Sequence, residues 1–229
     1  MTTGQKTTSV LLKCIVALSA VIGTILSAWA GRNAFMGGHR VFMYFTIQSN
    51  IAVAVISVIG LVLLLRRREI SPVWWVIKFV GAVSITLTGV VFCFVLAPTL
   101  GGNAWNLQNI LTHVVVPISA VTDFFVAGVS GNIRKRNTFW VIVPPVLYAV
   151  YAGIGYVSGW EFAPGVNYPY FFLNWGSPAG AFGFTDMLPF MGCGWWILGL
   201  LVALLIVGYL YLLLLDGIKK LFHSSSLTE

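Results

Sequence analysis

The chain has 229 residues, of which 59% are hydrophobic and only 8% are charged. A soluble domain carries about 25% charged residues, so this composition excludes a protein whose whole surface faces water. The net charge of +7 does not indicate nucleic-acid binding, because the basic residues gather at the ends of apolar segments.

Six apolar segments follow one another along the chain. A bilayer core about 30 Å thick needs roughly 20 apolar residues per helix. Six segments meet this length, at about 10–30, 44–65, 74–96, 107–129, 139–157 and 191–215. We therefore expect an all-α fold, a polytopic bundle of about six transmembrane helices that forms a single domain over residues 1–229. Segment 158–190 is rich in Gly, Pro and aromatic residues and is expected to cap the bundle.

Basic residues follow the second, fourth and sixth predicted helices. These residues are Arg66, Arg67, Arg68, Arg134, Lys135, Arg136, Lys219 and Lys220. Cytoplasmic loops of membrane proteins carry an excess of Lys and Arg, so both termini are predicted to be cytoplasmic. The second and fourth helices then begin at the outer face of the membrane.

Two ionisable residues are predicted to lie well within the spans, and both belong to the fourth helix. They are His113 and Asp123. Ionisable side chains inside a membrane are costly, which makes them candidates for function. Asp123 follows His113 by ten residues, about 15 Å along a helix axis. We therefore expect Asp123 to pair near the cytoplasmic end or to act as a proton or ion site.

Thr46 lies near the start of the second helix, at the same predicted depth as His113 in the fourth. A hydroxyl beside an imidazole is the minimum equipment for nucleophilic catalysis, because the imidazole can take the hydroxyl proton. Ser49 and Asn50 share a helix face with Thr46, and Asn109 shares a face with His113. Asn50 or Asn109 is predicted to steady the oxyanion or the imidazole.

Other interpretations of these residues remain open. A threonine in a membrane helix usually bonds back to a carbonyl one turn earlier, and a lone histidine often bridges two helices. The chain could therefore be a small proton- or ion-coupled transporter or channel that uses His113 and Asp123, or a non-catalytic membrane scaffold. No metal or organic cofactor is expected, because His39, His113 and His223 are dispersed along the chain.

Three short motifs carry a resemblance to a known family. They are the segments 44–50 (YFTIQSN), 111–117 (LTHVVVP) continuing to Asp123, and 168–173 (YPYFFL). With its six-helix plan, the chain resembles a family of bacterial six-helix integral membrane proteins. More distantly it resembles the androgen-induced membrane proteins of animals, which are threonine hydrolases of fatty acid esters of hydroxy fatty acids.

The resemblance implies an intramembrane hydrolase of lipid-like carboxylic esters in the bacterial cytoplasmic membrane. Thr46 matches the nucleophile of the animal family and His113 its general base. Tyr168, Pro169 and Tyr170 match an aromatic-proline motif that we expect to line the substrate pocket. The implied partners are a lipid or fatty acid ester and the bilayer, without nucleic acid and without a cofactor, and the oligomeric state stays open.

Overall fold

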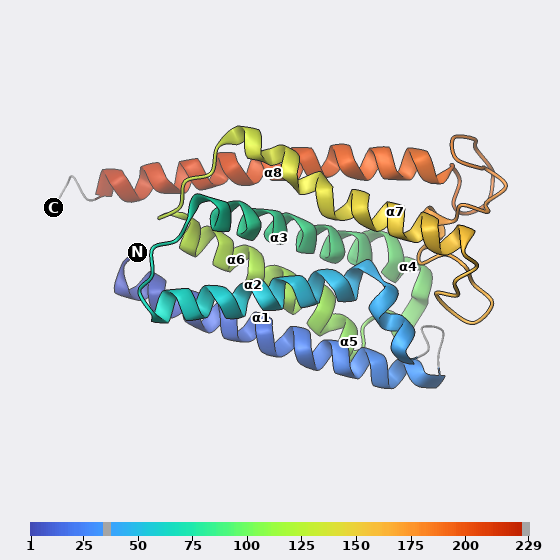
Figure 1. The fold of residues 1–229 in the computed structure, drawn as a ribbon, viewed down its shortest axis with the longest axis horizontal. Helices are drawn as coiled ribbons and strands as arrows, with labels where there is room; N and C mark the ends of the chain where they lie inside the picture. The colour runs from blue at the N-terminus through green and yellow to red at the C-terminus, as the bar shows by residue number, and fades with distance from the viewer. Residues whose placement is uncertain (34–37, 226–229) are drawn as a thin grey trace.

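The computed structural model describes residues 1–33 and 38–225, and this part of the chain contains helices and loops but no β-strand. Long helices run side by side along the longest axis of the molecule (Figure 1). Six of them are long and apolar enough to cross a membrane: Thr3–Ala30, Phe45–Leu65, Pro72–Leu100, Leu107–Gly128, Lys135–Val157 and Cys193–Leu221. The prediction of an all-α bundle with six apolar spans is confirmed.

Three of the spans are built from more than one helical segment. The continuous helices are α1 (Thr3–Ala30), α2 (Phe45–Leu65) and α8 (Cys193–Ser225). The third span joins α3 (Pro72–Val91), a π-helical turn (Phe92–Leu96) and α4 (Ala97–Leu100). The fourth joins α5 (Leu107–Ile110), a π-helical turn (Leu111–Val115) and α6 (Val116–Gly128). The fifth joins a 3₁₀ segment (Lys135–Ile142) and α7 (Val143–Val157).

The helices at the two ends of the chain are longer than their apolar segments. α1 begins at Thr3 because Thr2 caps it, with the Thr2 side chain accepting from the Gln5 backbone and the Gln5 side chain accepting from the Thr2 backbone. α8 continues through polar residues to Ser225. Hydrophobicity limits the part of a helix that lies in the bilayer, whereas capping and backbone hydrogen bonds decide where the helix ends.

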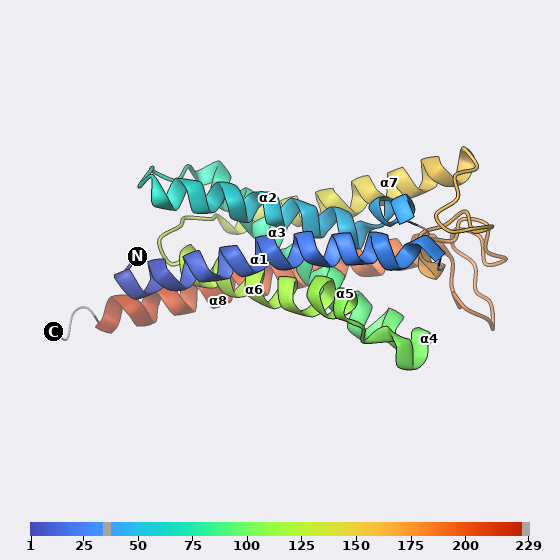
Figure 2. The same ribbon diagram turned by 90° about the horizontal axis from the view of Figure 1, so that it is seen from below.

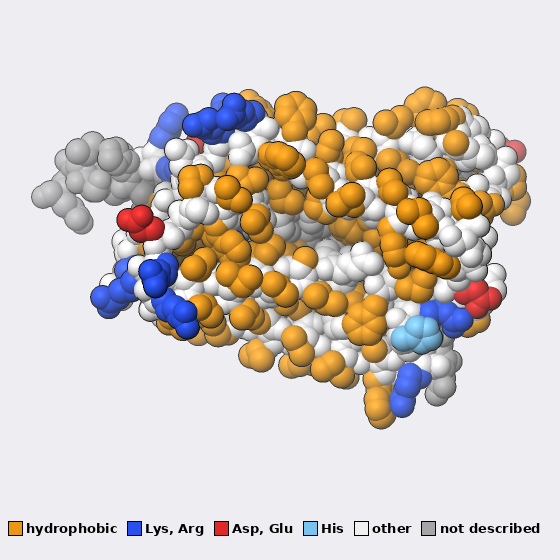
Figure 3. Space-filling view, in the orientation of Figure 1, with side chains coloured by type: hydrophobic (Ala, Val, Ile, Leu, Met, Phe, Trp, Pro, Cys, Tyr) orange, Lys and Arg blue, Asp and Glu red, His pale blue; other side chains and the backbone are white. Residues whose placement is uncertain are grey.

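The two ends of the bundle differ in what they expose. Both termini lie at one end, and the long loop 158–192 lies at the other (Figures 1 and 2). Lys and Arg side chains gather mainly at the end that holds the termini, while hydrophobic side chains cover the long sides (Figure 3). Leu18 and Leu147, for example, are each 63% exposed. Such an apolar belt is the surface that a multi-pass integral membrane protein presents to lipid.

Two buried regions hold the bundle together, and one of them lies at the loop end. In the interior, α1 packs against α2 and α6, and α3 packs against the same two helices. At the loop end, Tyr44, Tyr148, Phe162, Phe172 and Leu173 form a buried cluster. This cluster joins the start of α2, α7 and the loop, so the loop is held directly over the first turn of α2.

Candidate active site

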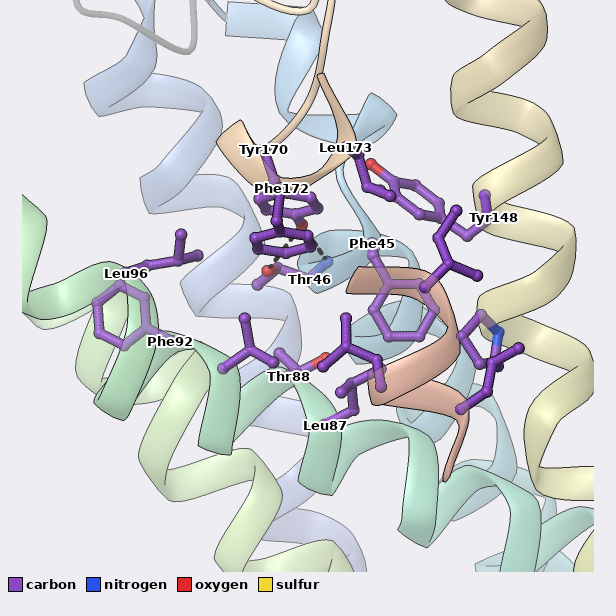
Figure 4. A pocket seen from close by; sticks show the side chains of 16 residues that line it. Phe45, Thr46, Leu87, Thr88, Phe92, Leu96, Tyr148, Tyr170, Phe172 and Leu173 are labelled. Carbon is purple, nitrogen blue, oxygen red and sulfur yellow. Dashed lines mark hydrogen bonds between the residues drawn. The ribbon is translucent and has the colours of Figure 1, made fainter. Parts of the chain in front are cut away.

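Thr46 lies in the first turn of α2 and is 9% exposed. The first N–H groups of a helix have no partner within that helix. Here the Thr46 N–H donates to the hydroxyl of Tyr170 at 3.3 Å, and the Thr46 and Tyr170 hydroxyl oxygens lie 3.4 Å apart (Figure 4). The Tyr170 oxygen therefore accepts from an N–H group that has no partner within α2.

Both hydroxyls belong to an apolar cavity of about 60 Å³ that α2, α3, α7, α8 and the loop enclose. The ring of Phe172 stacks on Tyr170, with centroids 5.1 Å apart. The side chains that Figure 4 labels around the cavity are Phe45, Thr46, Leu87, Thr88, Phe92, Leu96, Tyr148, Tyr170, Phe172 and Leu173. Of the predicted pocket residues, Tyr170 lines this cavity, whereas Tyr168 and Pro169 are not among its lining residues.

Tyr170 is a neutral hydrogen-bonding group at physiological pH. Burial raises the pKa of Tyr170 above its ordinary value, and hydrogen bonding with Thr46 offsets part of this rise. Burial and the neighbouring Tyr170 also raise the pKa of Tyr44. A neutral phenol keeps its proton, so Tyr170 can donate a hydrogen bond into the cavity.

Two more tyrosine hydroxyls attach the loop end to the start of α2. Tyr44 donates to the carbonyl of Phe162 at 3.0 Å, and Tyr148 donates to the carbonyl of Met43 at 3.0 Å. The Tyr44 and Tyr170 rings meet edge to face with centroids 5.7 Å apart. These contacts keep Tyr170 in place above Thr46.

Ser49 and Asn50 support the backbone at Thr46. Ser49 donates to the Thr46 carbonyl at 2.9 Å, and its oxygen lies 2.7 Å from the Thr88 hydroxyl. The Asn50 amide donates to the carbonyls of Thr46 at 2.8 Å and Thr112 at 3.1 Å. Both amide hydrogens of Asn50 are thus used by carbonyls, so Asn50 joins α2 to the π turn of the fourth span rather than facing an oxyanion.

His113 lies in that π turn and is 8% exposed. Its Nδ1 lies 3.0 Å from the Thr112 hydroxyl and 3.1 Å from the Asn109 carbonyl. A carbonyl only accepts, so Nδ1 carries the proton and Nε2 carries a lone pair that can act as a base. The side chain of Asn109 donates to the Ala104 carbonyl at 2.8 Å. Asn109 therefore orients the imidazole through its backbone, not through its amide.

The ring of Phe92 lies between the imidazole and the Thr46 cavity. Phe92 stacks on His113 with centroids 3.8 Å apart, and Phe92 lines the Thr46 cavity. His113 lines a different cavity, of about 350 Å³, together with Cys93 and Tyr211. Among the hydrogen bonds of residues 1–33 and 38–225, none joins Thr46 to His113. The bridge through Asn50 brings their two segments together, but the side chains face different cavities.

The two stacked rings both belong to π turns that precede a proline. The N–H of Val116 bonds to the carbonyl of Leu111, and the N–H of Ala97 bonds to that of Phe92, five residues back in each case. Pro117 and Pro98 come next and have no N–H to give, so regular α-helical pairing cannot resume there. π turns are rare and frequently occur at functional sites.

Asp123 belongs to a separate buried cluster nearer the end that holds the termini. Its Oδ1 accepts from Ser9 at 2.5 Å and from Lys13 at 2.7 Å, and its Oδ2 lies 2.7 Å from the Lys78 ammonium. The expectation that only His113 and Asp123 are ionisable inside the spans is wrong, because Lys13 and Lys78 are 5% and 7% exposed. The positions of Lys13 and Lys78 inside apolar segments are the signal in the sequence that points to this.

Comparisons with models of protein families, with curated proteins and with solved structures found no match. The function of this protein is therefore inferred from its own geometry. In the part of the chain that the structure describes, no group of three His, Cys, Asp or Glu side chains could hold a metal ion.

A wide groove adjoins the Thr46 cavity. It lies between α2, α3 and the fifth span, has a volume of about 850 Å³, and opens on the side of the bundle (Figure 3). Phe45 and Tyr148 line both the groove and the cavity. Its wall is mainly apolar, with polar side chains at Gln48, Ser49, Ser84 and Asn137. An amphipathic molecule in the bilayer could reach the neighbourhood of Thr46 through this groove.

Proposed function

We propose that the protein hydrolyses lipid-like carboxylic esters inside the membrane, with Thr46 as the nucleophile. The observation that carries this proposal is the pairing of the Thr46 hydroxyl with the neutral Tyr170 hydroxyl in an apolar cavity at the N-terminus of α2. The Thr46 hydroxyl is then a nucleophile that lies beside a donor for the developing oxyanion, the Tyr170 hydroxyl.

In the proposed reaction the ester carbonyl takes the position next to the two hydroxyls. Thr46 Oγ1 attacks the carbonyl carbon, and the hydroxyl of Tyr170 donates to the developing oxyanion. The ester C–O bond breaks, the alcohol leaves with the proton, and an acyl-threonine remains. Water then hydrolyses the acyl-threonine to the free acid and restores Thr46.

His113 is the base in this proposal, because its Nε2 carries the lone pair. The stacked Phe92 ring separates it from the cavity. Proton transfer between Thr46 and His113 therefore requires Phe92 to turn out of its stacked position. A Phe92→Ala variant should retain or increase activity, whereas His113→Ala should lose most of it.

The groove supports a lipid substrate over a water-soluble ester. A cavity of about 60 Å³ accommodates the reacting group but not a long acyl chain, while the adjoining groove of about 850 Å³ has room for one. Its opening faces the side of an apolar bundle, where lipid chains are the surrounding medium.

Labelling of the detergent-purified protein with a fluorophosphonate probe tests the proposal. Wild type should be labelled, Thr46→Ala should not, and His113→Ala should be labelled much more slowly. Thr7→Ala is the matched control, because the Thr7 hydroxyl donates to the carbonyl of Thr3 in its own helix, and Thr7 lines neither the Thr46 cavity nor the His113 cavity. It should be labelled like wild type.

Labelling that persists in Thr46→Ala would overturn the assignment of the nucleophile. A folded wild type that is not labelled and does not cleave long-chain esters would contradict hydrolysis as a whole. Loss of ion flux on Asp123→Asn in such a protein would then favour the transporter interpretation of His113 and Asp123.

A further inference from the structure

The cluster around Asp123 contains more positive than negative charge. Both ammonium groups, of Lys13 and Lys78, lie 2.7 Å from a carboxylate oxygen of Asp123. The only other ion pair of the described residues, Arg40 with Glu161, involves partly exposed side chains elsewhere. Two buried cations thus share one anion, and an unbalanced charge in a low-dielectric interior is costly.

A small cavity lies against the same side chains. It has a volume of about 20 Å³, and its lining includes Lys13, Ser57, Lys78 and Asp123. This volume suits one water-sized particle. Ser57 is 6% exposed and lines the cavity, so its hydroxyl can donate to a particle held there.

The hydrogen bonds of the cluster leave donors but no acceptor for this cavity. An ammonium group has three N–H donors. Those of Lys13 are used by Ser9 and both carboxylate oxygens of Asp123, whereas Lys78 donates to Asp123 Oδ2 and to the Asp123 carbonyl at 3.0 Å. One N–H of Lys78 is therefore left over, and both carboxylate oxygens already accept from cations.

We propose that this cavity binds one small monovalent anion, such as chloride, between Lys78, Lys13 and Ser57. The anion would balance the second ammonium and accept from the spare N–H of Lys78 and from the Ser57 hydroxyl. The volume excludes larger anions such as phosphate or a carboxylate. Gly60 makes room for the site, because a Cβ there would lie 3.0 Å from Cε of Lys13.

Anion binding would join four spans at one point. Lys13 belongs to α1, Ser57 to α2, Lys78 to α3, and Asp123 to α6. A ligand that binds only the folded state stabilises it in proportion to the logarithm of its concentration. The bundle should therefore become more stable as chloride increases, and this effect is independent of any hydrolase activity.

Thermal unfolding of the detergent-purified full chain tests the proposal. Sodium chloride is exchanged for sodium gluconate at constant ionic strength, and sodium bromide serves as a second small anion. At a chloride or bromide concentration ten times its Kd, the Tm of wild type should rise by about 3–6 °C. Gluconate should have no effect. Ser57→Ala should fold and show a weaker dependence on chloride. Lys78→Gln should lose that dependence, whereas Lys6→Gln, a change at an exposed lysine of α1, should keep it.

Two outcomes would overturn the proposal. Equal Tm values for wild type in chloride and gluconate would mean that the excess charge is removed in another way, such as loss of a proton from a lysine. A chloride effect of unchanged size in both Ser57→Ala and Lys78→Gln would mean that the anion binds elsewhere. Crystals grown in bromide give a direct check, since an anomalous peak is expected beside Lys78 Nζ.

Discussion

Two hydroxyl groups from segments 124 residues apart meet at the start of α2. Tyr170 is held near Thr46 because the Tyr44 hydroxyl bonds to the Phe162 carbonyl of the loop and the Tyr148 hydroxyl bonds to the Met43 carbonyl just before α2. Each contact is an ordinary hydrogen bond, worth about 1 kcal/mol in stability. Together they hold a polar pair inside an otherwise apolar cavity.

The buried tyrosines predict how stability changes at high pH. The pKa of Tyr44 and of Tyr170 is raised in the folded protein, while the unfolded chain ionises its tyrosines near pH 10. Above about pH 10 the folded state therefore holds more protons than the unfolded state, so the free energy of unfolding falls as pH rises. We expect Tm to decrease between pH 9 and 11 and the decrease to be shallower in Tyr44→Phe. An equal slope in both proteins would contradict this.

The Asp123 cluster predicts a strong effect of removing one charge. Asp123→Asn leaves two buried ammonium groups without a carboxylate, and breaking a buried ion pair costs about 3–5 kcal/mol. Unfolding measured in mixed detergent should show this loss. Asp216→Asn, at an exposed position on α8, should change stability by less than about 0.5 kcal/mol.

A second substitution in the same cluster separates charge from packing. Adding Lys78→Met to Asp123→Asn removes one of the two unpaired ammonium groups and should restore part of the stability. Equal or lower stability of the double variant would mean that side-chain packing, rather than charge, explains the loss.

At the scale of elements, the fourth span shows that a continuous apolar segment can contain a change of helix type. The sequence predicts one helix over 107–129, and the span does run over Leu107–Gly128. Within it the π turn Leu111–Val115 changes the direction in which later side chains point. His113 lies within this turn and stacks against Phe92 of the third span, a contact between spans that the pattern of one helix does not predict.

The contact between α1 and this π turn gives a prediction for Gly23. A Cβ at Gly23 would lie 2.7 Å from Cγ2 of Thr112, whose hydroxyl contacts His113. Gly23→Ala should therefore cost about 1–3 kcal/mol in stability and reduce esterase activity. Gly199→Ala on α8 is the matched control, because a Cβ there meets no atom within 4 Å. It should be neutral or slightly stabilising, and equal losses in both variants would contradict the predicted crowding.

At the scale of the whole molecule, the shared position of the two termini gives a topology that can be measured. Both lie at the end where Lys and Arg side chains gather. We predict that reporters fused to either terminus are cytoplasmic, and that a cysteine introduced at Thr185 in the long loop is labelled from outside intact cells. Labelling of that cysteine only after cell lysis would reverse the orientation.

The groove predicts a dependence on the length of the substrate. Ala52 lines the groove, whereas Val62, on the same helix, is 41% exposed and is not among the groove residues. Ala52→Trp should lower kcat/KM for long-chain esters at least about tenfold and leave short-chain esters nearly unchanged. Val62→Trp should affect neither. Equal losses for both chain lengths would place the acyl chain elsewhere.

Much of the architecture followed from the sequence because a bilayer imposes local rules. A span needs a continuous apolar segment of fixed length, so six segments were sufficient to predict the number and approximate bounds of the spans. The predicted common depth of Thr46 and His113 rests on the same counting. Basic residues next to the spans likewise predicted an orientation without any knowledge of packing.

Contacts between helices depend on the rotation of each helix, and only the tertiary structure decided them. A count of residues along an axis does not reveal that Phe92 lies between His113 and the Thr46 cavity, or that Tyr170 bonds to Thr46. It also does not reveal that Lys13 and Lys78 turn inward to one carboxylate. Each of these contacts joins residues on different elements, so its geometry is set by the packing of the whole bundle and not by local sequence.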